Sequence, residues 1–200
     1  MAQPIEFYFD FSSPYGYLAA QQIDTVGEKH GRAVAWKPFL LGTVFSTTGS
    51  QPLLNIPMKG DYARIDMARE ARRLGVPFTI PTPFPFHSLA ACRAFYWLED
   101  QDPAAAKALA KAVFHGAFGE GRDMGDGEAV IELAGELGVD REALAVALKD
   151  PAVKERLRKE VENGTEKGVF GAPFLFVDGE PFWGQDRIET IDRWLETGGW

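Results

Sequence analysis

The sequence predicts an α/β fold in which both ends of the chain build one sheet and a long helical block lies between them. A strand pattern at Ile5–Phe11 runs directly into a helix start at Pro14. Apolar residues then recur at helical spacing through much of residues 61–166. After that block, two short strand patterns flank Asp178-Gly179, a strong signal for a hairpin turn. The predicted order is strand, helix, strand, helical block, hairpin and helix.

The first strand has two largely apolar or aromatic faces, which is typical of a central strand covered on both sides. One face carries Ile5, Phe7, Phe9 and Phe11, and the other carries Glu6, Tyr8 and Asp10. We therefore expect this strand to lie inside the sheet.

A helix is expected to begin at about Pro14, because serine is favoured at the N-cap and proline at the first helical position. Its inner face would carry Ala19, Ile23 and Val26. Ser13 would then lie where unpaired main-chain N–H groups and the positive end of the helix dipole face outward. A thiolate or a carboxylate would be stabilised at this position.

The second strand is predicted at Ala33–Leu41, and the β-α-β unit that it completes should be parallel. Pro38 lacks a main-chain donor, which places the far end of this strand at an edge or a bulge. The following segment, Gly42–Gly60, is rich in Thr, Gly, Ser and Pro. A loop of this length is usually functional or poorly ordered.

The helical block is interrupted by Pro77–Phe86, whose four prolines exclude a regular helix or a central strand and whose aromatics suggest a packed, extended loop. Helices are predicted around it at Asp61–Leu74, His87–Glu99, Pro103–Phe118, Glu128–Leu137, Arg141–Leu148 and Pro151–Glu166.

The C-terminal part changes character at Gly168–Pro173, which ends the helices. Strands are predicted at Phe174–Val177 and Glu180–Trp183, on either side of the hairpin turn. A last helix follows, with Asp186 as its expected N-cap.

Composition narrows the class of protein. Forty-six per cent of the 200 residues are hydrophobic, which supports a folded core. The net charge of −8 disfavours a nucleic-acid binder, because phosphate contacts need clustered Lys and Arg. The single cysteine, Cys92, excludes an intrachain disulfide and a CxxC pair. With no signal-peptide pattern and no apolar run long enough to span a membrane, the expectation is a soluble cytoplasmic protein.

The strand order, the turn after the first strand and the Ala172-Pro173 step before the hairpin together resemble a thioredoxin fold. The helical insertion resembles that of the bacterial disulfide oxidoreductases. On this resemblance, residues 1–55 and 166–200 form the thioredoxin-like domain, and residues 56–165 form an inserted helical domain. The CxxC position of those enzymes reads Ser13-Pro14-Tyr15-Gly16 here, so the protein itself cannot exchange thiols and disulfides.

The serine version of the motif is similar to the 2-hydroxychromene-2-carboxylate isomerases and the related kappa-class glutathione transferases. The resemblance is carried by FYFDFSSPYGYLA at 7–19, KGVFGAPFLFV at 167–177 and FWGQDRI at 182–188. It implies a glutathione-dependent isomerase that acts on 2-hydroxychromene-2-carboxylate or a similar unsaturated aromatic 2-oxo acid, by reversible addition of the glutathione thiolate. It also implies a homodimer. A kappa-like transferase that conjugates electrophiles and a redox-inactive thioredoxin-like binding module are the alternatives.

The resemblance also assigns roles to individual residues. Ser13 would face the sulfur of glutathione and carry the catalytic role. A cis bond at Pro173 would turn the Ala172 backbone toward Ser13, where it could pair with the cysteinyl backbone. The γ-glutamyl end would bind at Gln185 and Asp186, and glutathione would also be approached by Lys59.

Each of these residues also has a purely structural interpretation. Ser13 could act only as an N-cap, with Ser12 as a competing cap that could share its role. Pro173 could simply start a strand, Asp186 could cap the last helix, and Lys59 could be a solvated loop residue. The local sequence leaves both interpretations open.

Other polar residues carry weaker signals. The three histidines show no metal-ligand spacing. Cys92 lies among apolar helix positions and is expected in the core. Asp10 could orient groups near the turn or could be a buried, hydrogen-bonded aspartate. Trp183 adjoins the predicted glutathione motif and is the one tryptophan with a possible role beyond packing.

Overall fold

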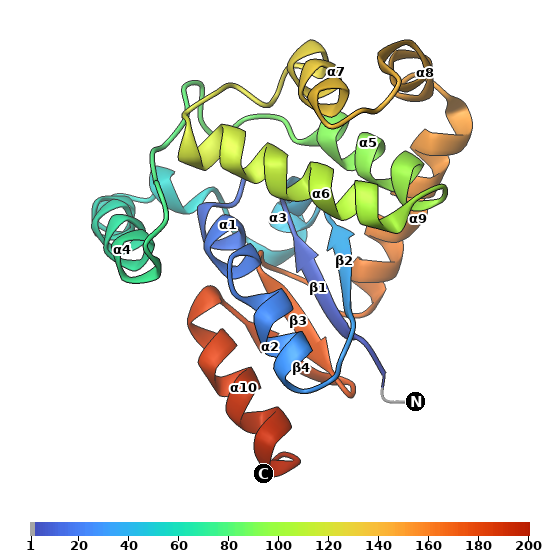
Figure 1. Ribbon diagram of the computed structural model, residues 1–200. Coiled ribbons are helices and arrows are strands. Elements are labelled where there is room, and N and C mark those ends of the chain that lie inside the picture. The colour runs from blue at the N-terminus through green and yellow to red at the C-terminus, as the bar shows by residue number, and fades with distance from the viewer. Residues whose placement is uncertain (1–2) are drawn as a thin grey trace.

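Both ends of the chain meet in one four-stranded sheet, as the computed structural model shows for residues 3–200 (Figure 1). The strands are β1 (Ile5–Phe9), β2 (Val34–Pro38), β3 (Phe174–Val177) and β4 (Glu180–Trp183), in the spatial order β2-β1-β3-β4. β1 pairs parallel with β2 and antiparallel with β3, which forms an antiparallel hairpin with β4. The predicted central position of the first strand and the parallel β-α-β unit are confirmed, and β2 lies at the edge.

The helices follow the predicted order. After β1 come α1 (Pro14–Ala20) and α2 (Ile23–Lys29), and after β2 come three short turns, η1 (Leu41–Val44), α3 (Phe45–Thr48) and η2 (Leu53–Asn55). The helical block contains α4 (Lys59–Leu74), α5 (Leu89–Glu99), α6 (Pro103–Phe114), the π-helical turn η3 (His115–Gly119), α7 (Gly127–Glu136), α8 (Arg141–Ala147) and α9 (Pro151–Glu166). The chain ends with η4 (Gln185–Arg187) and α10 (Ile188–Thr197). This is a thioredoxin-like fold with a large helical insertion, as predicted.

The first helix differs from its prediction, because it divides into α1 and α2. The side-chain amides of Gln21 and Gln22 donate to the carbonyls of Tyr17 and Leu18, which a continuous helix would use. The main-chain N–H of Gln22 turns to Ala19 instead. The apolar periodicity was preserved across the break, so the sequence pattern did not reveal it.

The two faces of β1 lie in two separate cores, as expected for a covered central strand. Ile5, Phe7 and Phe9 belong to the main core, while Tyr8 belongs to a smaller one on the opposite face. α6 crosses over the main core, where the buried ring of Phe114 lies 5.3 Å from the ring centroid of Phe9. The sheet and the helical block therefore share one hydrophobic core.

The proline-rich segment is the packed, extended loop that was predicted. It contains no helix or strand, and its Thr82-Pro83 and Phe84-Pro85 bonds are cis. Three of its aromatic rings, those of Phe78, Phe84 and Phe86, lie 6.3–6.4 Å from the ring of Phe118.

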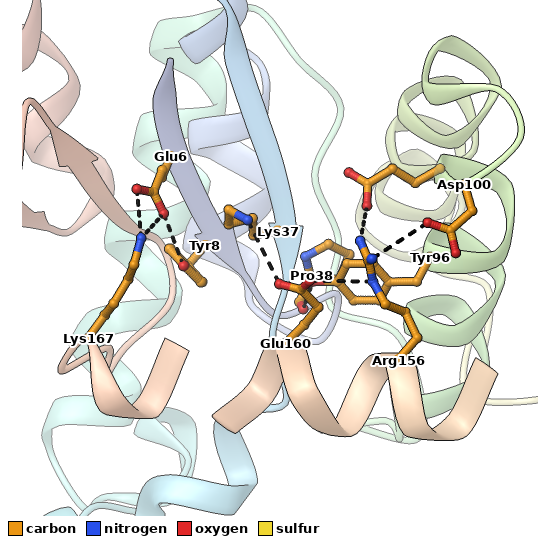
Figure 2. A network of polar contacts seen from close by, with 10 residues as sticks. Glu6, Tyr8, Lys37, Pro38, Tyr96, Asp100, Arg156, Glu160 and Lys167 are labelled. Carbon is orange, nitrogen blue, oxygen red and sulfur yellow. Dashed lines mark hydrogen bonds and ion pairs between the residues drawn. The ribbon is translucent and has the colours of Figure 1, made fainter. Parts of the chain in front are cut away.

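Ion pairs fix α9 against the face of the sheet opposite α1 (Figure 2). Lys167, just after α9, contacts the carboxylate of Glu6 on β1 at 2.6 Å. Glu160 on α9 lies 3.8 Å from Lys37 on β2 and 3.4 Å from Arg156, which also contacts Asp100 after α5. These contacts join α9, at the end of the insertion, to the sheet on one side and to the end of α5 on the other.

A second charged cluster joins the sheet region to α6. Asp24 on α2 accepts hydrogen bonds from Lys107 at 2.9 Å and from the indole of Trp36 at 3.1 Å, and it contacts Lys111 at 2.7 Å. Burial would raise the pKa of Asp24, but hydrogen bonds from Lys111, Lys107 and Trp36 outweigh it and hold this pKa below its usual range.

Because its pKa is lower in the folded state, Asp24 stabilises the fold above its unfolded pKa, and this contribution is lost as the pH falls through the folded value. We expect Asp24→Asn to reduce the free energy of unfolding at pH 7. The difference from the wild type should shrink below about pH 4, near the unfolded pKa of aspartate. Urea unfolding between pH 7 and pH 2.5 measures this, with Glu132→Gln, an exposed carboxylate, as the control. A difference that does not change with pH would contradict the assignment.

Candidate active site

A cavity of 1470 Å³ opens beside the end of β1 and is bounded by α4 and by the segments before β3 and after β4. Its wall includes every residue that the sequence analysis selected for the site: Ser13, Lys59, Ala172, Pro173, Gln185 and Asp186. Segments from both ends of the chain and from the helical block are thus brought together around one space.

Ser13 is the N-cap of α1, and its hydroxyl has two partners. The oxygen accepts from the main-chain N–H of Gly16 at 3.0 Å, and the proton is donated to the carbonyl of Ala172 at 2.8 Å. The Ala172-Pro173 bond is cis. The expected approach of the Ala172 backbone to Ser13 is therefore present, and the capping geometry predicted for Ser13 is confirmed.

Two main-chain donors beside Ser13 have no acceptor within residues 3–200: the N–H groups of Tyr15 and Ala172. Pro14 has no N–H, and those of Ser13 and Gly16 are paired with Asp10 and with the Ser13 hydroxyl. Because α1 has only seven residues, these individual donors, more than a long helix dipole, favour negative charge here.

Asp10 anchors the turn that presents Ser13. Its side chain is 4% exposed and accepts from the main-chain N–H and the hydroxyl of Ser12, both at 2.8 Å, and from the hydroxyl of Ser88 at 2.8 Å. Its other oxygen accepts from the N–H of Leu41 at 2.9 Å. One buried carboxylate thus joins the end of β1, the segment after β2 and the start of α5.

Ser12 and Ser13 are chemically different in this arrangement. Ser12 donates its proton to a carboxylate, whereas Ser13 donates to a neutral carbonyl. Hydrogen bonds to ionised acceptors are the stronger ones, so an incoming anion would attract the proton of Ser13 more readily than that of Ser12. Ser13, and not Ser12, caps α1.

The turn after β4 corrects one prediction: Asp186 is not an N-cap. The helical turns begin one residue earlier, at Gln185, and the carboxylate of Asp186 instead pairs with Arg187 at 2.9 Å. Gly184 precedes this turn with a φ of 115°, a conformation that favours glycine, and its N–H donates to Pro173. The side chain of Asp186 is 67% exposed and faces the cavity without a capping role.

Lys59 is the first residue of α4 and not part of a loop, which corrects a second prediction. Three lysine and arginine side chains line the cavity. Arg73 contacts Glu70 and Glu189, and Arg187 contacts Asp186. Within residues 3–200, Lys59 is the one of the three with no carboxylate oxygen within 4.0 Å.

Sequence analysis did not identify the polar wall that α4 contributes. Tyr15 donates to Asp66 at 2.8 Å, and Gln185 donates to Glu70 at 3.4 Å. Burial and the hydrogen bond to Asp66 raise the pKa of Tyr15. Burial alone would raise the pKa of Asp66, but hydrogen bonds from Arg69 and Tyr15 hold it below its usual range. In the sequence, Asp66 and Glu70 look like ordinary charged residues of an amphipathic helix, and nothing in the pattern indicates that they contact Tyr15 and Gln185.

Two partly exposed aromatic rings line the cavity. Trp183 and Phe170 are 57% and 40% exposed, with ring centroids 4.8 Å apart. A Cβ at Gly171 would collide with the indole, so glycine lets this ring lie close to the chain. Trp183 is therefore placed at the cavity as its position in the sequence suggested.

Cys92 is fully buried, as predicted, and burial raises the pKa of its thiol well above the usual value. It is therefore not a reactive thiolate. His87 lines the cavity, whereas residues 3–200 contain no group of three His, Cys, Asp or Glu side chains arranged to hold a metal ion. Over the same residues, no helix has the length and apolar character needed to cross a membrane.

Comparisons with a family model, with curated proteins and with solved structures all relate this chain to thioredoxin-like proteins of one family. Residues 4–196 match the family model of the DSBA-like thioredoxin domain. A 2-hydroxychromene-2-carboxylate isomerase of Sphingobium xenophagum is 32% identical over 98% of this chain and 99% of its own. A solved structure of a 2-hydroxychromene-2-carboxylate isomerase superimposes with a TM-score of 0.88 at 30% identity, covering 98% of this chain and 95% of that one. Glutathione S-transferase kappa 1 of Caenorhabditis elegans is 25% identical over 96% of this chain and 90% of its own.

The fold and the serine at the start of α1 define a thioredoxin-fold protein that lacks a redox cysteine pair. The chain belongs to the DSBA-like thioredoxin family and, within it, to the 2-hydroxychromene-2-carboxylate isomerases. It is accordingly an enzyme of the group that contains these isomerases and the kappa-class transferases.

The Asp10 anchor leads to a prediction about stability. Asparagine at position 10 would offer one acceptor oxygen and place an NH₂ group against existing donors. We expect Asp10→Asn to lower the free energy of unfolding by about 2–4 kcal/mol, since a hydrogen bond to a charged group contributes about 1.5–3 kcal/mol. Chemical denaturation measures this, with Asp61→Asn, on the exposed side of α4, as the control. An Asp10→Asn protein as stable as the wild type would show that the four contacts do not stabilise the turn.

Proposed function

We propose that the protein is a glutathione-dependent isomerase acting on 2-hydroxychromene-2-carboxylate or a similar unsaturated aromatic 2-oxo acid. The observation that carries this proposal is the Ser13 hydroxyl, held between the start of α1 and the Ala172 carbonyl at the wall of a large cavity. The similarity to isomerases over nearly the whole chain supports the reaction class.

The residues around the cavity fit a bound glutathione. Ala172 offers an N–H with no acceptor within residues 3–200 and a carbonyl whose present donor is a movable hydroxyl proton, as an added extended peptide requires. Asp186 offers a carboxylate for the γ-glutamyl ammonium, beside the main-chain donors of the η4 turn. Lys59, which has no carboxylate oxygen within 4.0 Å among the described residues, offers a cation for a carboxylate of glutathione.

Glutathione would supply a thiolate that adds reversibly to the double bond of the 2-oxo acid, allows bond rotation or ring opening, and leaves again. Ser13 would stabilise this thiolate. Its oxygen is fixed by Gly16, so the proton needs only to turn about the Cβ–Oγ bond from Ala172 toward the anion. An anionic acceptor forms a stronger hydrogen bond than the neutral carbonyl, which favours this exchange.

The helical block would provide the apolar wall for the aromatic part of the substrate. Phe84 and Phe86 come from the proline-rich segment of this block, and Phe170 and Trp183, from outside it, also line the cavity. The cavity is large enough to hold a tripeptide and a small aromatic acid together, since pockets for drug-sized ligands measure about 300–1,000 Å³.

Ser13→Ala tests the role of the hydroxyl. We expect turnover of 2-hydroxychromene-2-carboxylate to fall about 10- to 100-fold, because a hydrogen bond to a charged group contributes about 1.5–3 kcal/mol. Loss of the cap should cost about 1 kcal/mol of stability. Glutathione should still bind, and the pKa of its bound thiol should rise, which thiolate absorbance against pH would follow.

The control for this substitution is Ser46→Ala, an exposed serine outside the cavity wall. Full isomerase activity of Ser13→Ala together with an unchanged thiol pKa would rule out the proposed role. Product analysis separates the two enzyme classes: an isomer with glutathione regenerated supports isomerisation, and a stable conjugate supports a transferase.

Asp186→Ala tests the γ-glutamyl contact. Because Asp186 does not cap α10, its loss should leave the melting temperature nearly unchanged. The dissociation constant of glutathione, measured by calorimetry, should rise about tenfold, which corresponds to about 1.4 kcal/mol. Glu189→Ala is the matched control, because it removes a neighbouring exposed carboxylate of the same cavity. Equal effects of the two substitutions would indicate a general charge effect.

A further inference from the structure

The cavity contains a second polar cluster, formed by Asp10, Ser12 and Ser88, which the proposed thiolate chemistry does not use. All three side chains line the cavity wall. Asp10 and Ser88 are 4% and 5% exposed, whereas Ser12 is half-buried. Ser12 therefore presents the accessible surface of the cluster, and the other two support it from behind.

The direction of the hydrogen bonds in this cluster is fixed by its chemistry. An ionised carboxylate can only accept, so Ser12 and Ser88 must both donate their protons to Oδ1 of Asp10. Their oxygens are then left with lone pairs and no free proton. Ser88 occupies the N-cap position of α5, yet its hydroxyl makes no cap bond and serves Asp10 instead.

The charge of the cluster, like its free lone pairs, favours a ligand that donates a hydrogen bond. The four donors to Asp10 are all neutral, and within residues 3–200 no lysine, arginine or histidine nitrogen lies within 4.0 Å of its carboxylate. Its negative charge therefore disfavours an anion at Ser12 and favours a hydrogen-bond donor. Lys59, the cavity lysine without a carboxylate partner in the described part of the chain, lies on a different element, at the start of α4.

We propose that Asp10, Ser12 and Ser88 form an acceptor subsite that binds the hydroxyl group of an aromatic substrate. This inference rests on the proposed function and adds to it a group that selects among substrates. A phenol or hemiketal hydroxyl would donate to Ser12, while a carboxylate at the same position would be repelled. The 2-oxo acid carboxylate would then lie away from this cluster. Ser12 is a binding residue here and takes no part in thiolate stabilisation.

The test compares two ligands that differ by one hydroxyl, trans-o-hydroxybenzylidenepyruvate and trans-benzylidenepyruvate. Their dissociation constants are measured by calorimetry without glutathione, so that no turnover occurs. We expect the wild type to bind the hydroxylated ligand about five- to tenfold more tightly, the range for one hydrogen bond. Ser12→Ala should reduce this ratio to about one without changing the affinity for the unhydroxylated ligand.

Two further measurements keep the test decisive. Ser12→Thr retains a hydroxyl and should retain the preference. Glutathione affinity should be the same for Ser12→Ala and the wild type, because the subsite serves the aromatic ligand. A wild type with no preference, or a Ser12→Ala protein that weakens both ligands equally, would overturn the proposal. A preserved hydroxyl preference in a protein that does not isomerise would refute the proposed function and leave this subsite standing.

Discussion

The buried carboxylate of Asp10 is the constraint on which the rest of the site depends. A carboxylate at the end of a central strand is costly to bury unless its lone pairs are satisfied. Here the donors come from the adjoining turn, from the segment after β2 and from the start of α5. Satisfying one charge therefore fixes three elements that are far apart in sequence. The turn held in this way is the one that places Ser13 against Ala172.

Two adjacent serines acquire different chemistry from this one charge. The proton of Ser12 is committed to a strong acceptor, whereas that of Ser13 is shared with a neutral carbonyl and can be redirected. Ser12 consequently behaves as an acceptor toward the cavity and Ser13 as a donor. The sequence presents the two serines as equivalent cap candidates, and the hydrogen bonds to Asp10 and Ala172 distinguish them.

Local patterns predicted the strands and the helical insertion, because strand alternation, Ser-Pro and Asp-Gly are short-range signals. The residues around the cavity were assigned from the family resemblance, since the local sequence alone left a structural interpretation of each of them open. The break between α1 and α2 was not predictable from apolar spacing, since the polar side chains of Gln21 and Gln22, which donate to main-chain carbonyls at the break, leave that spacing unchanged. Ser88 and the carboxylates of α4 were missed because their partners lie far away in the sequence. Asp186 was wrongly assigned as a cap from its residue type. The residue at which a helix starts depends on backbone geometry, which residue type alone does not determine.

The distribution of sulfur and charge limits what this fold can catalyse. A thioredoxin-fold protein without a cysteine at the start of α1 retains the donors that stabilise a thiolate but has no thiolate of its own there. Cys92 cannot replace it, because it is buried in the core and its thiol pKa is raised. Under the proposed function the sulfur arrives with glutathione. The main-chain N–H groups of Tyr15 and Ala172, which have no acceptor within residues 3–200, lie where that ligand would be received. Under the proposed function, this site therefore differs from one for disulfide exchange in that it would activate the thiol of a bound ligand.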